Sequence, residues 1–182
     1  PKTHVPRRRL CMPATTDYWV NDANAEPLLF VTAPANVGLL AMMDTELLPE
    51  IRRLAGDDRR VTLIFDREGW SPTRFKTWHT AGFDVITYRK GTYRDWRRRC
   101  FHKVTVEVGG RKVVYRLGER MVRVARGFRM REVRRLCDSG HQTSVMTTRR
   151  DLAIETVARR MFSRWQQENF FRYMRQEFAL DH

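Results

Sequence analysis

The stretch Val61-Thr62-Leu63-Ile64-Phe65-Asp66 decides how the rest of this chain is interpreted. Its first five residues form a nearly continuous apolar run, as expected for a strand that is buried on both faces of a sheet. After Asp66, the pair Ser71-Pro72 has the N-cap and first-turn pattern of a helix, which we expect to end at Gly82. Residues 83–88 have the pattern of a second strand. This order predicts a strand–helix–strand unit with an acidic side chain at the carboxyl end of its first strand.

The residues before this unit predict further elements of the same domain. Two strands joined by a turn are expected within residues 16–32, and apolar residues at helical spacing predict a helix over 38–54 that Gly56 ends. Residues 1–14 are basic and contain prolines, which is typical of a connecting arm. We therefore take residues 15–91 as the first part of a folded core.

Residues 92–148 have a different pattern from that core, and residues 149–182 are its last predicted segment, a C-terminal core helix. The former alternate apolar and polar residues and carry a hairpin signal at Gly109-Gly110, which predicts a β-rich insertion. The latter predict a long helix over about 150–178, which would return to the core. We expect Trp96 to be packed in the interior rather than wedged into a ligand. The arginines of the insertion either track a nucleic-acid backbone or are solvated surface charges: Arg94, Arg97, Arg98, Arg99, Arg111, Arg116, Arg120, Arg123 and Arg126.

Charge is the first indication of a partner. The 182 residues include 35 Lys and Arg against 21 Asp and Glu, a formal net charge of +14, while 42% hydrophobic residues suffice for a core. Such an excess suits a polyanion, because each neutralised phosphate releases counterions. A basic globular protein without nucleic acid is the alternative. No apolar run has the length of a membrane-spanning helix, and three widely spaced cysteines indicate a reducing, cytoplasmic setting.

Two carboxylates are candidates for chemistry. Asp66 follows a buried strand, and ligands of open α/β sheets bind at the carboxyl ends of strands. Glu168 lies within the last predicted helix, and helical spacing places Arg164 and Arg175 on nearly the same stripe. The alternatives are a turn-capping Asp66 and an ordinary solvated helix face around Glu168.

Together these stretches resemble the DDE-type transposases of insertion sequences. Residues 64–69 resemble the strand end that carries the second catalytic Asp of that family, and residues 164–175 resemble its Tyr-Arg-Glu-Lys signature. Arg164 and Glu168 match the signature by spacing, and Arg175 stands at the position of its Lys with the charge retained. Met161 stands at the position of its Tyr, which is a departure from the pattern.

The resemblance implies an α/β fold with a ribonuclease-H-like mixed sheet flanked by helices. In this family a β-rich insertion precedes the helix that carries the catalytic Glu, which suits residues 92–148. The two predicted strands within 16–32 would be the second and third of the core. The first strand, with the first catalytic Asp, would then precede Pro1, since Asp17 and Asp22 are not placed like that residue. Both ends of the chain look cut, and we expect a catalytic-core fragment that is inactive alone.

The resemblance also implies an activity, namely cleavage and strand transfer of DNA at transposon ends. Asp66 and Glu168 would hold two Mg²⁺ or Mn²⁺ ions, and Arg164 and Arg175 would bind DNA phosphates. The implied partner is double-stranded DNA, bound by a homodimer in the prokaryotic cytoplasm, associated with the nucleoid. A catalytically dead DNA-binding remnant of a transposase and another ribonuclease-H-like nuclease, such as a resolvase, are the alternatives.

Overall fold

The structure is a computed structural model that describes residues 3–5, 10–12, 14–108 and 110–162. The chain divides into two compact units, and the boundary between them lies after Asp58. The first unit contains β1 (Thr3–Val5), β2 (Leu10–Met12), β3 (Thr15–Asn21), β4 (Pro27–Pro34), α1 (Leu39–Met42), the π-helical turn η1 (Met43–Leu47) and α2 (Leu48–Ala55). The second contains β5 (Val61–Phe65), the 3-10 turn η2 (Arg67–Gly69), α3 (Pro72–Thr80), β6 (Phe83–Tyr88), the 3-10 turn η3 (Arg98–Cys100), β7 (His102–Val108), β8 (Arg111–Ala125), β9 (Phe128–Leu136), β10 (Gln142–Thr147) and α4 (Ile154–Phe162).

The first unit is built from two hairpin-like strand pairs and one interrupted helix. β1 pairs with β2 and β3 pairs with β4, both antiparallel. Trp19 of β3 stacks on Phe30 of β4 with ring centroids 4.9 Å apart, a cross-strand aromatic contact that stabilises the pair. In the turn between these strands, Asp22 Oδ1 accepts hydrogen bonds from the backbone N–H groups of Asn24 and Glu26. Gly56 ends α2 with a φ of 81°, a conformation that glycine adopts without steric cost.

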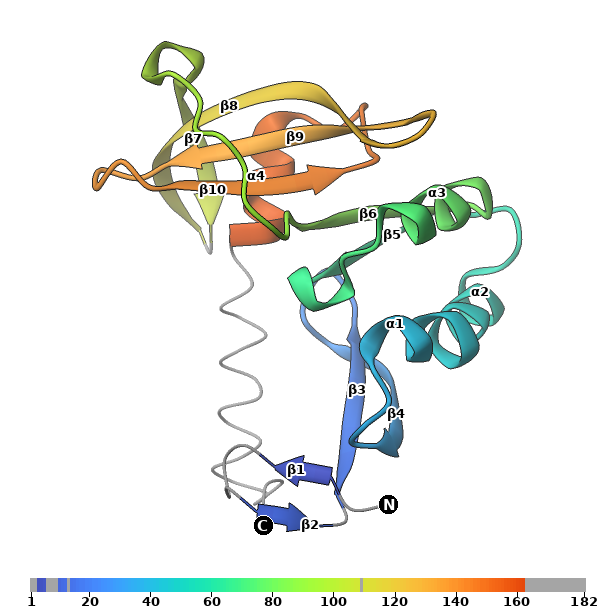
Figure 1. Ribbon diagram of the computed structural model, residues 1–182. Coiled ribbons are helices and arrows are strands. Elements are labelled where there is room, and N and C mark those ends of the chain that lie inside the picture. The colour runs from blue at the N-terminus through green and yellow to red at the C-terminus, as the bar shows by residue number, and fades with distance from the viewer. Residues whose placement is uncertain (1–2, 6–9, 13, 109, 163–182) are drawn as a thin grey trace. The chain divides into compact units, whose positions relative to one another are not determined.

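The second unit is organised around a six-stranded mixed sheet with the strand order β5-β6-β10-β9-β8-β7. β5 and β6 are parallel, and α3 forms the connection between them. All other neighbouring strands in this sheet are antiparallel. Figure 1 shows the strands from β10 to β7 curving around α4.

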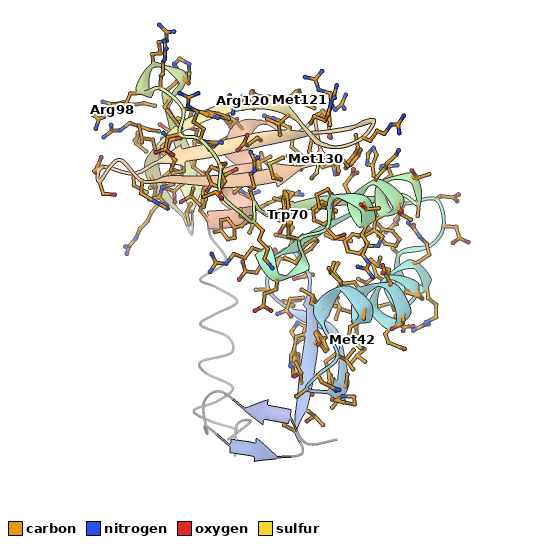
Figure 2. All side chains as sticks on the ribbon, viewed as in Figure 1. Met42, Trp70, Arg98, Arg120, Met121 and Met130 are labelled. Atoms are coloured by element: carbon orange, nitrogen blue, oxygen red, sulfur yellow. The ribbon has the colours of Figure 1, made fainter. Side chains whose placement is uncertain are left out.

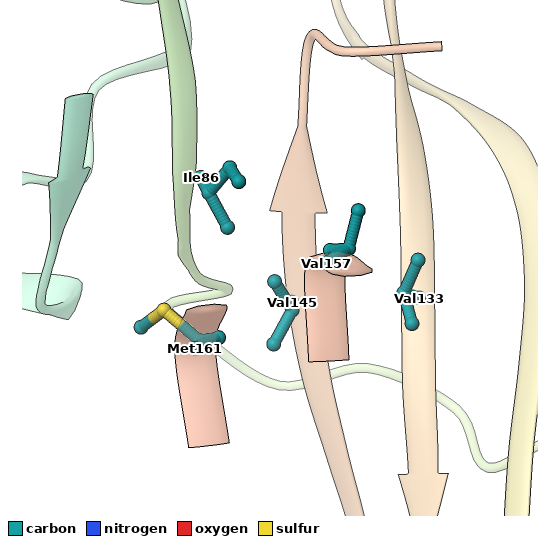
Figure 3. Packing of buried hydrophobic residues seen from close by; sticks show 5 residues of the cluster. All are labelled: Ile86, Val133, Val145, Val157 and Met161. Atoms are coloured by element: carbon teal, nitrogen blue, oxygen red, sulfur yellow. The ribbon is translucent and has the colours of Figure 1, made fainter. Parts of the chain in front are cut away.

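The main apolar cluster lies between α4 and one face of this sheet. Ile86, Val133 and Val145 come from β6, β9 and β10, and Val157 and Met161 come from α4 (Figure 3). All five side chains are almost completely buried. Burying side chains of this size contributes about 1.5–3 kcal/mol each, so the cluster holds α4 on the sheet.

The opposite face of the β5–β6 pair is covered by α3. Phe75 and Trp78 of α3 lie 5.9 Å and 6.1 Å from Phe65 of β5, measured between ring centroids. Successive side chains of a strand point to opposite faces of the sheet. Ile86 of β6 therefore packs on the α4 side, and Val85 lies on the opposite face, which α3 covers. β6 is therefore buried nearly throughout, and its two buried polar residues, Asp84 and Thr87, are hydrogen-bonded.

The predicted order of elements over residues 15–88 is confirmed, and the fold is mixed α/β. β3 and β4 pair with each other, and within the described ranges no hydrogen-bonded register joins them to the six-stranded sheet. A ribonuclease-H-like arrangement, in which they would be core strands, therefore stays a prediction. The β-rich segment 92–148 shares one sheet with β5 and β6 through the pairing of β10 with β6.

The last predicted helix starts later than its sequence pattern suggested. α4 begins at Ile154, and Arg149 and Asp151 before it form an ion pair of 2.6 Å. The part of that prediction after residue 162 lies outside the described residues.

Gly118 of β8 is a position where only glycine fits. Its Cα faces the η3 turn, and a Cβ there would overlap the backbone carbonyl oxygen of Cys100. We expect Gly118→Ala to lower the free energy of unfolding by about 3 kcal/mol, because backbone atoms cannot move aside as a flexible side chain can. Urea denaturation measures this change. Gly38→Ala is the control, since its Cβ would meet open space; equal effects of the two substitutions would contradict the packing described.

Candidate functional site

Asp66 is held at the carboxyl end of β5 by contacts of its own backbone and side chain. Its Oδ1 accepts a hydrogen bond of 2.5 Å from the backbone N–H of Arg67 and caps the η2 turn. Its backbone carbonyl accepts a hydrogen bond of 3.2 Å from Thr87 Oγ1 on the neighbouring strand β6. The side chain is exposed. Asp66 therefore caps a turn, as the structural interpretation predicted. Its side chain is also exposed to solvent at the carboxyl end of a strand, where a ligand-binding acid is expected.

An open pocket of about 560 Å³ lies beside Asp66. It occupies the carboxyl ends of β5 and β6 and the start of the antiparallel strand β10, all within the second unit. Side chains and backbone of eleven residues line it: Asp66, Arg67, Glu68, Tyr88, Arg89, Lys90, Gly91, Tyr93, His141, Thr143 and Ser144. Ligands of open α/β sheets bind at such strand ends, where side chains from adjacent strands converge.

The pocket carries more positive than negative charge. Arg67, Arg89 and Lys90 outnumber Asp66 and Glu68 among its lining residues. Arg67 and Lys90 have no ion-pair partner among the residues that the structure describes. The pocket therefore has cationic groups available for an anionic ligand.

Behind the pocket, a buried carboxylate organises several arginines. Glu132 of β9 is fully buried, and its Oε1 accepts hydrogen bonds of 2.7 Å from Ser144, 2.8 Å from Arg134 and 3.1 Å from Arg89. Arg120 Nε of β8 lies 3.8 Å from the other oxygen, Oε2. Two of these partners, Arg89 and Ser144, also line the pocket. The buried cluster and the pocket wall are thus physically continuous.

Aromatic rings alternate with these guanidinium groups. The Arg134 guanidinium carbon lies 4.5 Å from the ring centroid of Tyr93 and 4.4 Å from that of Trp96. Arg120 lies 4.2 Å from the centroid of Trp96 and is half exposed (Figure 2). Trp96 is buried against Phe101 and Leu136, as predicted for an interior residue. Cation–π contacts of this kind stabilise the arginines in fixed orientations.

The environment of Glu132 keeps it ionised. Burial by itself raises the pKa of this carboxyl, but hydrogen bonds from Ser144 and Arg134 and the charges of Arg134 and Arg89 outweigh the burial. The net result is a pKa below the usual value for Glu. Asp84 near the start of β6 is also ionised. Burial raises the pKa of its carboxyl, but contacts with Arg60, Thr148 and His79 outweigh burial, so the pKa lies below the usual value for Asp.

The other predicted site residues cannot be placed beside Asp66. Glu168, Arg164 and Arg175 lie outside the described residues. Met161, at the position of the signature Tyr, is buried in the apolar cluster of α4 (Figure 3).

Asp17 and Asp22, the two acids compared with the first catalytic Asp of the resembled family, form hydrogen bonds within the β3–β4 hairpin. Asp17 accepts a hydrogen bond of 2.6 Å from Thr32 Oγ1, and Asp22 caps the turn. The arginines predicted along the insertion are exposed except for the half-buried Arg116, which pairs with Asp138.

The end of α4 is connected to the pocket. The Tyr88 hydroxyl donates a hydrogen bond of 3.4 Å to the backbone carbonyl of Met161, and the Tyr88 ring lies 6.4 Å from that of Phe162. Tyr88 itself lines the pocket beside Asp66. The last described residues of the chain are therefore one side chain away from the pocket.

The residues beside the pocket fit part of a metal site. Asp66 Oδ2 has no hydrogen-bond partner within the described part of the chain, and Glu68 lies on the same wall. Carboxylate oxygens are the ligands that Mg²⁺ prefers. Over residues 14–108 and 110–162, however, no group of three or more His, Cys, Asp or Glu side chains is arranged to hold a metal ion. A complete ligand set would require residues beyond these.

Comparison with known proteins identifies the family. A family described as "Transposase protein" matches residues 1–182, the whole chain. The chain belongs to this transposase family. Curated proteins gave no match to the sequence. Family membership implies that DNA is the partner of this transposase chain, in agreement with its net charge of +14. No helix in the described ranges is long and apolar enough to cross a membrane.

Three residues of the pocket and of the cluster behind it were not predicted from the sequence: Arg89, Glu132 and Arg134. A signal was available on β9, where Glu132 and Arg134 alternate with the other residues and share one face with buried Met130 and Leu136. Two opposite charges in line with apolar residues indicate a buried ion pair. Arg89 has no comparable signal, because its role comes from the pairing of β6 with β10.

The stability of this transposase chain should depend on the charge of Glu132. Because the folded-state pKa of Glu132 is lowered, its contribution is complete above the unfolded value of about 4.3 and is lost as pH falls through the folded value. We expect Glu132→Gln to cost about 3–5 kcal/mol at pH 7, since Arg134 is left buried without its counter-charge. The difference from wild type should shrink below about pH 4.

Urea denaturation at several pH values measures this difference. Glu107→Gln removes an exposed glutamate of β7 and serves as the control, with no measurable effect expected. A gap between wild type and Glu132→Gln that stays constant down to pH values well below 4 would contradict the assignment of Glu132 as an ionised buried group.

Proposed function

We propose that this chain is part of the catalytic core of a DDE-type DNA transposase, which cleaves DNA and transfers strands at transposon ends. Membership of a transposase family over residues 1–182 supports the general class. The proposal assigns Asp66 and Glu168 as metal-binding carboxylates and Arg164 and Arg175 as phosphate-binding residues. Mg²⁺ or Mn²⁺ in a two-metal site is the cofactor that these residues would hold.

One observation carries the proposal beyond the family. Asp66 is exposed at the carboxyl end of β5, in a pocket with an excess of cationic side chains. An acid that served only as a turn cap would not require arginine and lysine side chains around an open pocket. A phosphoryl-transfer site requires both, since carboxylates hold the metal ions and cations bind the negatively charged backbone.

The position of α4 gives further support. Its last turn contacts Tyr88, which lines the same pocket as Asp66. The segment that contains Glu168 begins directly after this turn in the sequence. In the sequence only five residues separate Phe162, the last residue of α4, from Glu168, and the proposal requires this segment to bring the second carboxylate to the pocket.

Each part of the proposed site has a distinct role. Metal ions bound there would polarise the phosphoryl oxygen and lower the pKa of bound water. Asp66 would contribute a carboxylate oxygen, Oδ2, as a metal ligand. The hydrogen bond from Thr87 Oγ1 to the backbone carbonyl of Asp66 fixes the position of this residue. Arg164 and Arg175 would orient the phosphates of the substrate through paired N–H donors.

The proposal includes a third carboxylate that the described residues do not supply. The proposal also has the protein act as a homodimer on paired transposon ends. The proposed location is the prokaryotic cytoplasm, in association with the nucleoid. A DNA-binding remnant without activity is the alternative that the following experiment distinguishes.

The decisive experiment uses the complete open reading frame that encodes this chain, with DNA carrying both ends of its element. We expect strand-transfer products that require Mg²⁺ or Mn²⁺, and Asp66→Asn should reduce them at least about hundredfold, because a metal ligand contributes several kcal/mol to the transition state. DNA binding in EDTA, measured in parallel, should be unchanged by this substitution or become slightly tighter.

Asp138→Asn is the matched control, since this aspartate is 96% exposed and lies outside the pocket. Metal-dependent nicking without strand transfer would indicate another nuclease of this class. DNA binding without any cleavage, unaffected by Asp66→Asn, would establish the inactive remnant instead.

A further inference from the structure

We propose that the wall of the pocket formed by Arg89 and Lys90 is a subsite for a phosphate group of a DNA strand. Arg89 is the principal donor, and buried Glu132 is the positioning residue that fixes it. This inference rests on the proposed function only for the choice of DNA as the source of the phosphate. The need for an anion follows from the contacts and charges of the residues themselves.

Arg89 is held in one orientation by two contacts. Its Nη1 donates a hydrogen bond of 3.1 Å to Glu132 Oε1, and its guanidinium carbon lies 5.2 Å from the ring centroid of Tyr93. The side chain is 27% exposed, so part of the guanidinium faces the pocket. Ordering a flexible side chain before binding removes an entropic cost that would otherwise weaken the contact with a ligand.

The cluster behind Arg89 has an excess of positive charge. Three guanidinium groups, of Arg89, Arg120 and Arg134, surround the single carboxylate of Glu132. Arg134 is fully buried, and its Nη2 has no hydrogen-bond partner in the described structure. The two fully buried charges, those of Glu132 and Arg134, balance each other. The excess positive charge therefore lies on the partly exposed Arg89 and Arg120, and at Arg89 an anion in the pocket can pair with it.

The shape and chemistry of this wall favour a phosphate. A guanidinium presents parallel N–H donors that match two oxygens of a phosphate, and the ammonium of Lys90 adds a mobile charge beside it. Asp66 and Glu68 repel an anion from the opposite part of the pocket. The phosphate is therefore expected at the end of β6, one strand away from Asp66, where a bound DNA strand would pass the proposed catalytic carboxylate.

Substitution of Glu132 separates positioning from simple electrostatics by the sign of its effect. Glu132→Gln removes a negative charge, so a purely electrostatic role predicts tighter DNA binding. Loss of the anchor for Arg89 predicts weaker binding. In a variant that is folded, weaker binding to DNA in spite of the added positive charge therefore indicates a positioning role.

The test measures binding of the whole chain to a short fluorescent duplex by anisotropy, in EDTA, between about 50 and 200 mM salt. We expect Arg89→Gln to weaken binding about tenfold, as loss of a charged hydrogen bond does. The salt dependence, as the slope of log K against log salt, should become shallower by about 0.9. Arg89→Lys should restore the slope and only part of the affinity. Glu132→Gln should weaken binding.

Arg111→Gln is the matched control, because it removes one exposed arginine at the start of β8. Circular dichroism verifies folding, and if Glu132→Gln does not fold, Ser144→Ala tests the same anchor through its 2.7 Å bond to Glu132. Equal losses for Arg89→Gln and Arg111→Gln would overturn the proposal, as would inorganic phosphate binding that depends on Arg89 while DNA binding does not. Binding in EDTA requires no catalysis, so the subsite can be established even if no strand transfer is observed. Strand transfer can likewise be established even if Arg89 makes no contribution to DNA binding.

Discussion

The parallel pairing of β5 with β6 is the constraint on which the pocket depends. Val61 lies opposite Phe83 and Phe65 opposite Thr87, so the two strands end at the same edge of the sheet. Adjacent strands are about 4.8 Å apart, which brings the residues after each strand into one pocket. An antiparallel pairing would have sent them to opposite edges. The aromatic packing of α3 on β5 maintains this pairing, since α3 is the connection between the strands.

The buried Glu132 cluster is difficult to explain by stability alone. Replacing a buried ion pair by apolar residues of similar volume is often neutral or stabilising, because the charges must be removed from water. A cluster that is kept in spite of this cost is better explained by what it positions. Here the cluster fixes Arg89 and Ser144 at the pocket wall, and its Arg134 donates a hydrogen bond of 2.8 Å to the backbone carbonyl of Arg94, close to Trp96 in the chain. Fold and candidate site therefore share the same side chains.

The β-rich segment 92–148 contributes directly to the pocket. β10 pairs with β6 on one side and β9 on the other, so the pocket wall is built from both the strand–helix–strand unit and the β-rich segment. α4 packs on these strands and ends beside Tyr88. Elements from four separate stretches of the chain thus converge on one edge, which is typical of sites formed by tertiary structure rather than by a single motif.

The sequence by itself determined the elements and the position of Asp66. The apolar run 61–65, the Ser71-Pro72 start and the alternation after residue 102 are local patterns, and local backbone preferences are sufficient to produce them. Membership of a transposase family agrees with the excess of basic residues. Only the tertiary structure decided that β10 lies between β6 and β9 and that Glu132 meets Arg89. Strand order and partner choice depend on contacts between residues far apart in the chain, and no local spacing encodes them.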